Sequence, residues 1–288
     1  MSSSVISRYL NLIKFSHTIF ALPFAAIGFV LGLQKINFHF ESILAVKVLL
    51  CMVFARSAAM SFNRWTDRYI DKLNPRTAIR EIPSGKISSK SALTFTIVNC
   101  ILFIITTYFI NSLCFYLSFV ALAVVLGYSY TKRFTSLCHL ILGLGLSLAP
   151  IGAYLAVTGR FDWLPLFFSF AIICWVSGFD IIYALQDEQF DRNHHLQSVP
   201  GEFGVKNAIS IARNLHIAAS VFLLSAGFYA DLSLIYFIGW GIFTALLIYQ
   251  HTLVKENDLS KINLAFFTTN GIASIVFAVF VVSDLVWK

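Results

Sequence analysis

The feature that most constrains the fold of this chain is a series of apolar runs, each about long enough to cross a lipid bilayer. Nine runs occur, at residues 16–33, 43–62, 91–110, 113–130, 137–157, 164–185, 209–229, 232–253 and 263–286. A spanning helix needs about 20 apolar residues, and helices satisfy their own backbone hydrogen bonds inside lipid. The runs therefore predict an all-α fold: an integral membrane bundle of about nine transmembrane helices.

Composition also indicates a membrane protein. Of the 288 residues, 58% are hydrophobic and 12% are charged, whereas soluble domains carry about 25% charged residues. No clear small-residue cleavage site followed by a soluble domain comes after the first run, so we expect a retained helix rather than a signal peptide. We expect residues 1–288 to form a single transmembrane domain.

The basic residues are distributed as expected for a protein whose N-terminus faces the cytoplasm. Seven of them lie from Arg64 to Lys90, in the longest polar connection. An excess of Lys and Arg in cytoplasmic loops is the positive-inside pattern, so the net charge of +7 does not require nucleic acid as a partner. We expect a multi-pass protein of the inner (plasma) membrane, with aspartate-rich loops on the cytoplasmic side.

The second apolar run ends in three polar side chains at intervals of four residues, Asn63, Asp67 and Asp71. On an α-helix each such step turns the side chain by about 40°, so all three share one face over about two turns. Two carboxylates and an amide oxygen are therefore expected to converge there.

A similar pattern ends the sixth run. Asp180, Asp187 and Asp191 are separated by seven and four residues, which again places them on one face of a continuous helix. The two patterns hint at an internal repeat, in which a helix is followed by an acidic cytoplasmic loop.

Grouped carboxylates repel one another at neutral pH and require a cation, a proton or a basic partner. Magnesium is the natural candidate, because it takes oxygen ligands and is commonly bound by one or two carboxylates together with substrate phosphates. The alternative is that both patterns are solvated helix ends capped by acids. Two matching patterns in so hydrophobic a protein favour the metal.

Other polar residues near the membrane boundary suggest an anionic ligand. Arg56 lies two turns before Asn63 inside an apolar run, and an intramembrane arginine usually points into the bundle. Lys132 and Arg133 end the fourth run, either as a snorkelling anchor or as a diphosphate clamp. His17 is expected to be an interfacial, hydrogen-bonded residue. The three spans from residue 209 onward are interpreted as lacking intramembrane charge and are expected to complete a wall against lipid.

An apolar cavity with acidic faces and basic residues at its mouth suits a substrate that has a diphosphate head and a long apolar tail. Magnesium bridging the diphosphate would make it a better leaving group. An allylic diphosphate could then ionise, and an electron-rich aromatic ring would capture the cation.

The spacing Asn63-x-x-x-Asp67-x-x-x-Asp71 with Asp187-x-x-x-Asp191 resembles the paired signature of the UbiA superfamily of intramembrane aromatic prenyltransferases. The resemblance covers essentially the whole chain, including residues 18–23, 74–85, 128–134, 149–159 and 179–200. Within the superfamily, the chain is similar to the 4-hydroxybenzoate polyprenyltransferase branch.

This resemblance implies a role for each motif residue. Asn63, Asp67 and Asp71 would bind one Mg²⁺, and Asp187 and Asp191 the other. The four aspartates would be the catalytic residues. Substrate-binding roles would fall to Arg56, Asn63, Arg80, Tyr128, Lys132, Arg133, Asp180 and Tyr183.

The resemblance also implies the reaction and leaves the acceptor open. The expected activity is Mg²⁺-dependent transfer of a polyprenyl group from a polyprenyl diphosphate to an aromatic acid, foremost 4-hydroxybenzoate, in ubiquinone or menaquinone biosynthesis. The loop from Arg76 to Pro83 looks closer to a subgroup of the futalosine menaquinone route, in which the acceptor is a larger aromatic acid.

Other classes of membrane protein are alternatives. A multi-helix transporter also places charges within a bundle, but it does not need two aspartate-rich motifs. A CDP-alcohol phosphotransferase also uses clustered aspartates and magnesium, but its Asp-Gly-x-x-Ala-Arg core is absent. Haem-directed farnesyl transfer occurs in the same superfamily, and substrate tests separate it.

Overall fold

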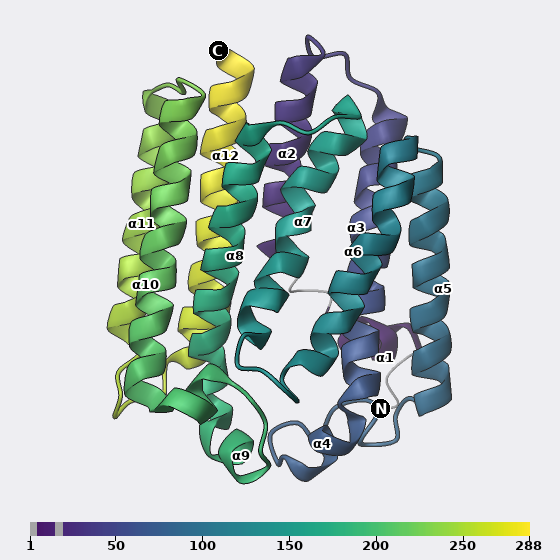
Figure 1. Cartoon of the computed structure of the whole chain (residues 1–288), viewed down its shortest axis with the longest axis vertical. Helices are drawn as coiled ribbons and strands as arrows, with labels where there is room; N and C mark the ends of the chain where they lie inside the picture. The colour runs from purple at the N-terminus through teal and green to yellow at the C-terminus, as the bar shows by residue number, and fades with distance from the viewer. Residues whose placement is uncertain (1–4, 15–19) are drawn as a thin grey trace. The chain divides into compact units, whose positions relative to one another are not determined.

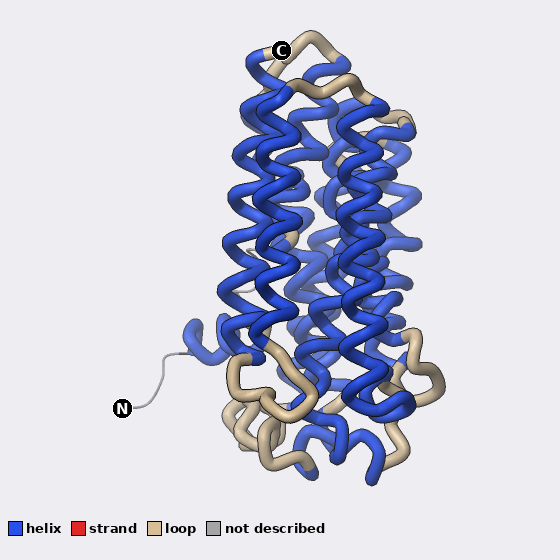
Figure 2. The backbone as a smooth tube through the Cα atoms, turned by 90° about the vertical axis from the view of Figure 1, so that its left-hand side faces the viewer, coloured by secondary structure: helices blue, strands red, loops and turns tan. Residues whose placement is uncertain are grey.

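The structure is a computed structural model that describes residues 5–14 and 20–288. In this part of the chain the regular secondary structure is helical, with loops and turns between the helices (Figure 2). Among the described residues, β-pairing is limited to one isolated bridge between Lys255 and Asp258. The predicted all-α fold is therefore confirmed.

The α-helices are, in chain order (Figure 1), α1 Val5–Leu12, α2 Leu22–Lys35, α3 Ser42–Thr66, α4 Arg68–Leu73, α5 Ser89–Tyr108, α6 Ser112–Thr131, α7 Cys138–Thr158, α8 Trp163–Ala184, α9 Glu188–Asn193, α10 Val199–Tyr229, α11 Leu234–Leu253 and α12 Asn270–Trp287. A 3₁₀ turn at Leu185–Asp187 joins α8 to α9, and a π-helical turn at Leu264–Thr269 precedes α12.

In the described residues, eight helical stretches are long and apolar enough to cross a membrane, and they coincide with the second to ninth predicted runs. The first run contains α2, which has 14 residues. The expected start of this run at residue 16, the proposed interfacial His17 and the family-like segment from Thr18 lie wholly or partly outside the described residues. The chain is an integral membrane protein.

Short polar side chains define where several helices begin. Ser88, Ser198 and Ser233 cap α5, α10 and α11 by accepting hydrogen bonds from backbone amides of the first turn. Asp162 does the same for Trp163 at the start of α8. Such caps satisfy amide donors that a helix start leaves without intrahelical partners.

The chain forms two compact units. The first unit contains α1 and α3 to α6, and the second contains α2 and α7 to α12. The single domain expected over residues 1–288 stays a prediction.

In the first unit, α3 and α5 run side by side (Figure 1). Ser61 and Thr96 share a hydrogen bond of 2.8 Å between their hydroxyl oxygens across this contact. The α1 helix packs its Leu12 against Ile87 and Ala92. Hydroxyl pairs and small residues of this kind allow apolar helices to associate inside a membrane.

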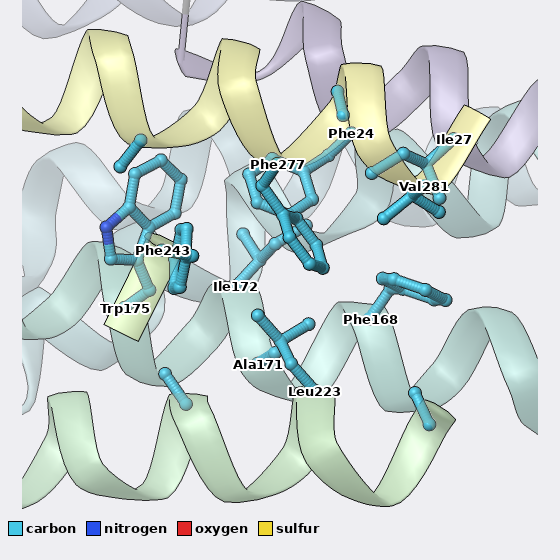
Figure 3. Packing of buried hydrophobic residues seen from close by; sticks show 14 of the residues in the cluster. Phe24, Ile27, Phe168, Ala171, Ile172, Trp175, Leu223, Phe243, Phe277 and Val281 are labelled. Carbon is cyan, nitrogen blue, oxygen red and sulfur yellow. The ribbon is translucent and has the colours of Figure 1, made fainter. Parts of the chain in front are cut away.

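The second unit contains an aromatic core (Figure 3). Trp175 of α8 lies 5.3 Å from Phe24 of α2 and 5.7 Å from Phe243 of α11, measured between ring centroids. Phe243 in turn lies 5.3 Å from Phe277 of α12. Tilted and edge-on ring pairs add about 0.5–1.5 kcal/mol each beyond the area they bury, so this core links four helices that are distant in sequence.

The α2 helix packs against α7 at a point where a side chain would not fit. A β-carbon added to Gly28 would stand 2.0 Å from the carbonyl oxygen of Pro150. Pro150 lies inside α7. Glycine at position 28 thus permits the close contact between these helices.

The expectation that the last three spans form a plain wall without charges is wrong. Asp284 of α12 is 1% exposed and accepts hydrogen bonds from the backbone amides of Ser233 and Tyr236 at the start of α11. Asn270 accepts a hydrogen bond of 2.9 Å from the Trp175 indole. These polar groups are tolerated because neighbouring helices supply their partners.

Candidate functional site

The first aspartate motif lies at the junction of α3 and α4 in the first unit. Asp67 separates the two helices, yet the backbone hydrogen bonds from Asp67 N to Asn63 O (2.9 Å) and from Asp71 N to Asp67 O (2.8 Å) continue across it. The four-residue register is preserved, so Asn63, Asp67 and Asp71 lie on one face, as their spacing predicted.

Both carboxylates of this motif are buried. Asp67 and Asp71 are 2% and 3% exposed. Asn63 Nδ2 donates to Asp67 Oδ2 at 3.3 Å, and Arg80 Nη1 donates to Asp71 Oδ1 at 2.7 Å. Asp71 Oδ2 is buried and has no hydrogen-bond partner among the described residues. Because an unsatisfied buried oxygen is costly, Asp71 offers a ligand atom for a cation.

The turn after α4 returns the chain to Asp71. Asn74 accepts hydrogen bonds from the backbone amides of Arg76 and Thr77, and the Thr77 hydroxyl donates to Asp71 O at 3.0 Å. These contacts place Arg80 against the Asp71 carboxylate. The long loop therefore has a structural consequence at the motif.

Arg56 and Arg64 of α3 also belong to this unit. Arg56, predicted from its intramembrane position, donates from Nη2 to Lys14 O at 3.4 Å and interacts electrostatically with Tyr128 of α6. Arg64 was not predicted as a site residue. It is 6% exposed, and its charge interacts with Asp71, Arg80 and Tyr128. The signal for it was a charged residue directly after Asn63 in a spanning helix.

The second aspartate motif lies in the second unit, where the predicted continuous helix from Asp180 to Asp191 is wrong. The α8 helix ends at Ala184, and the 3₁₀ turn separates it from α9. A 3₁₀ turn winds more tightly than an α-helix, so the seven-residue spacing does not keep Asp180 in helical register with the other two residues. Asp187 and Asp191 flank the first turn of α9 and interact electrostatically.

Asp191 is held by the start of α10. Ser198 Oγ donates to Asp191 Oδ2 at 2.7 Å and accepts from Gly201 N at 3.2 Å. Lys132 interacts electrostatically with Asp191, and its carbonyl oxygen accepts a hydrogen bond of 2.6 Å from Gln197 N. The structure thus brings predicted Lys132 to Asp191. The next residue, Arg133, is exposed.

The remaining predicted residues of the second unit have other neighbours. Asp180 Oδ2 lies 2.7 Å from His139 Nδ1, a contact that sequence reasoning missed. The centroid of the Tyr183 ring lies 4.2 Å from that of the Phe266 ring, and Tyr183 packs against the aromatic core of the second unit. The Asp180–His139 pair joins α8 to α7 across 41 positions of sequence, and no local pattern signals it.

The donor chemistry of both motifs fits magnesium. Across the described residues, no group of three or more His, Cys, Asp and Glu side chains is placed to hold a metal ion by itself. The first motif provides two carboxylates and an amide, and the second provides two carboxylates. Mg²⁺ needs no complete protein cage, because it retains waters and takes ligands from substrate phosphates. Each motif therefore suits a substrate-assisted magnesium site.

Comparisons with known proteins identify a family. The sequence profile described as UbiA prenyltransferase family matches residues 21–272. The chain is 31% identical over 245 residues to the 4-hydroxybenzoate octaprenyltransferase of Aliivibrio salmonicida, covering 83% of each protein. It is 29% identical over 234 residues to the enzyme of the same name from Nitrosospira multiformis, covering 81% of this chain and 80% of that enzyme.

Solved structures share the fold. The apo structure of a UbiA homolog from Aeropyrum pernix superposes with a TM-score of 0.79 at 26% identity, covering 94% of this chain and 97% of the other. A UbiA homolog from Archaeoglobus fulgidus, bound to DMAPP and Mg²⁺, superposes with a TM-score of 0.75 at 21% identity, covering 98% of this chain and all of that one.

Proposed function

This chain belongs to the UbiA prenyltransferase family, and we propose that it transfers a polyprenyl group from a polyprenyl diphosphate to an aromatic acid in a Mg²⁺-dependent reaction. Prenyl transfer itself follows from the family. The kind of acceptor, the metal and the site residues are the proposal. The proposed pathway is respiratory quinone biosynthesis.

The observation that carries the proposal is the buried acidic face of the first motif. Asp67 and Asp71 are almost fully enclosed in a membrane protein, and Asp71 keeps one oxygen without a hydrogen bond. Two buried carboxylates on one face are unfavourable unless positive charge compensates them. Arg80 is paired with one oxygen of Asp71, and the Arg64 charge also interacts with Asp71. A divalent cation would be held by Asp67 and by the Asp71 oxygen that has no hydrogen bond.

Each motif would hold one metal ion. Asn63, Asp67 and Asp71 are the proposed ligands of the first Mg²⁺, and Asp187 and Asp191 those of the second. The bound metal supplies Lewis-acid neutralisation of the diphosphate, which improves it as a leaving group. The A. fulgidus homolog was solved with DMAPP and Mg²⁺ and also with GPP and Mg²⁺, which supports the pairing of metal and prenyl diphosphate.

The chain's own residues would bind and orient the substrates. Lys132 and Arg133 supply positive charge for phosphate oxygens. Arg80 holds Asp71 through Oδ1, which leaves Oδ2 for the cation. The remaining predicted substrate-orienting residues are Arg56, Tyr128, Asp180 and Tyr183.

The proposed acceptor is 4-hydroxybenzoate, because the relatives that cover about four fifths of this chain carry that name. The bond between the prenyl carbon and the diphosphate oxygen breaks, and a carbon–carbon bond forms on the ring ortho to the phenol hydroxyl. The ring carbon then loses its proton. A larger aromatic acid of the futalosine menaquinone route is the second candidate, supported by the loop from Arg76 to Pro83.

The location is part of the proposal. The basic residues from Arg64 to Lys90 favour the cytoplasmic side for the loop after α3. We therefore place the active site at the cytoplasmic side of the inner (plasma) membrane.

A transfer assay tests the proposal. Membranes containing wild-type protein, Asp67→Ala, Asp187→Ala or Asp258→Asn are supplied with Mg²⁺, an allylic polyprenyl diphosphate and 4-hydroxybenzoate. Asp258 is an exposed acid outside both motifs, so Asp258→Asn is the matched control.

We expect prenylated product from wild type and the control, and none from the motif variants at equal protein levels. Aspartate-dependent diphosphate release without product would transfer the assignment to another acceptor. Absence of Mg²⁺-dependent turnover with every acceptor would refute the proposed function.

A further inference from the structure

His139 is a buried residue that the proposed chemistry does not use. It lies in the first turn of α7, is 4% exposed, and uses both ring nitrogens. Nδ1 lies 2.7 Å from Asp180 Oδ2, and Nε2 lies 3.3 Å from the backbone nitrogen of Val199. The imidazole therefore joins α7 to the end of α8 and to the start of α10.

These two contacts define one tautomer. A backbone amide only donates, so Nε2 must accept the hydrogen bond from Val199 N–H through its lone pair. A neutral imidazole with an unprotonated Nε2 carries its hydrogen on Nδ1. His139 Nδ1–H then donates to Asp180, which stays an acceptor. The contacts thus specify a neutral ring with a fixed hydrogen on Nδ1.

The Val199 amide lies next to the residue that holds Asp191. Val199 is the first residue of α10, and the preceding Ser198 is its N-cap. Ser198 Oγ donates to Asp191 Oδ2 at 2.7 Å. A single peptide unit therefore separates the amide bound by His139 from the hydroxyl bound by Asp191.

Neighbouring contacts fix the imidazole and the segment it holds. Ser177 Oγ donates to His139 O at 3.0 Å, which anchors the histidine backbone to α8. Cys138 Sγ lies 3.5 Å from Gln197 O, and Gln197 N donates to Lys132 O at 2.6 Å. Residues 197, 198 and 199 are thus bound to Lys132, Asp191 and His139 respectively.

We propose that His139 is a positioning residue that fixes Asp191 through the Val199 amide and Ser198, and fixes Asp180 through its Nδ1–H. This inference rests on the proposed function of Asp191 in holding Mg²⁺. Residues that orient metal ligands typically change metal affinity by about 10–100-fold when they are replaced.

Two substitutions separate the two contacts of the ring. Glutamine extends to the position of Nε2, so the amide oxygen of His139→Gln accepts from Val199 N–H while the bond to Asp180 is lost. Asparagine reaches only to the position of Nδ1, so His139→Asn keeps a donor for Asp180 and loses the acceptor for Val199. Ser198→Ala removes the next link without changing the histidine.

The first readout is binding of Mg²⁺ to detergent-purified protein, followed as thermal stabilisation in the presence of inorganic diphosphate. For His139→Gln, we expect the Mg²⁺ concentration that gives half-maximal stabilisation to lie within about twofold of the wild-type value. His139→Asn and Ser198→Ala should each require about tenfold more Mg²⁺. Equal midpoints for the Asn and Gln variants, or no Mg²⁺-diphosphate stabilisation of wild type, would overturn the inference.

The second readout is the tautomer itself. In protein labelled with ¹⁵N-histidine, the His139 signal is identified as the one that disappears in His139→Gln. In wild type this signal should be that of a neutral ring protonated at Nδ1. Its chemical shift should change in Asp180→Asn. A ring protonated at Nε2 or at both nitrogens would overturn the inference.

These measurements separate the inference from the proposed function. If wild type binds Mg²⁺ and diphosphate with the expected variant pattern but prenylates no aromatic acid, the proposed function fails and the positioning role stands. If wild type prenylates 4-hydroxybenzoate and His139→Asn matches it in Mg²⁺ requirement, the positioning role fails alone.

Discussion

The two aspartate motifs share a spacing of four residues and differ in how their charge is compensated. In the first, Asp67 and Asp71 are buried, and two arginines, Arg80 and Arg64, provide positive charge near Asp71. In the second, Asp187 and Asp191 are half-buried. Asp191 receives a hydroxyl hydrogen bond from Ser198 and the attraction of Lys132.

The difference shows that similar sequence patterns can have different energetic roles. A buried carboxylate loses hydration and needs a charged partner, so the first motif should contribute to folding as well as to activity. A half-exposed carboxylate keeps part of its hydration, so the second motif should affect activity with little effect on folding.

The largest effect is expected from Asp71→Asn. The substitution removes a proposed metal ligand and leaves Arg80 without its carboxylate partner. We expect the rate of prenyl transfer to fall by more than about 100-fold. This loss exceeds the effect usually seen when a residue that only orients a metal ligand is replaced. Unfolding free energy, followed by detergent denaturation, should fall by about 3 kcal/mol. If Asp71→Asn unfolds with the same free energy as wild type, the first motif does not contribute to folding as proposed.

Asp191→Asn should affect activity almost as strongly and stability much less. Its carboxylate is half-buried, and the amide oxygen can still accept from Ser198. We expect about a 100-fold loss of transfer and less than about 1 kcal/mol of unfolding free energy. If Asp191→Asn destabilises the protein as much as Asp71→Asn does, the two motifs do not differ as described.

Arg80→Gln sharpens the contrast within the first motif. Alone, it should cost about 1–3 kcal/mol of stability, because the buried Asp71 carboxylate loses its charged partner. In an Asp71→Asn background it should cost less than about 1 kcal/mol, since no carboxylate remains to be compensated. Additive losses, measured in a double-mutant cycle, would show that the 2.7 Å ion pair contributes nothing to stability.

The smallest effect on activity is expected from Trp175→Phe, which lies outside both motifs. The substitution removes the indole hydrogen bond to Asn270 and part of the aromatic packing. We expect about 1–2 kcal/mol of lost stability and transfer activity within about twofold of wild type. A large loss of activity at retained stability would give the aromatic core a functional role.

The fold could be predicted from sequence because apolar runs determine helices directly in a membrane protein. The run predicted at 164–185 corresponds to α8 at Trp163–Ala184, for example. The register of Asn63, Asp67 and Asp71 was predictable for the same reason, because helical spacing is local.

Features that depend on distant contacts could not be predicted. The 3₁₀ turn at Leu185–Asp187 carries no Gly or Pro to signal it. His139 was missed because its partners Asp180 and Val199 lie 41 and 60 positions away. Asp284 was overlooked when the last three spans were interpreted as lacking intramembrane charge, and only its contacts with the start of α11 reveal its structural role.

The central claim is that each aspartate motif holds one metal ion. It is tested most directly by counting bound Mn²⁺, as a paramagnetic substitute for Mg²⁺, on purified protein saturated with a non-hydrolysable prenyl thiodiphosphate. The account predicts two ions in wild type, and one ion in Asp71→Asn and in Asp191→Asn. One ion or none in wild type, or two ions in both variants, would contradict it.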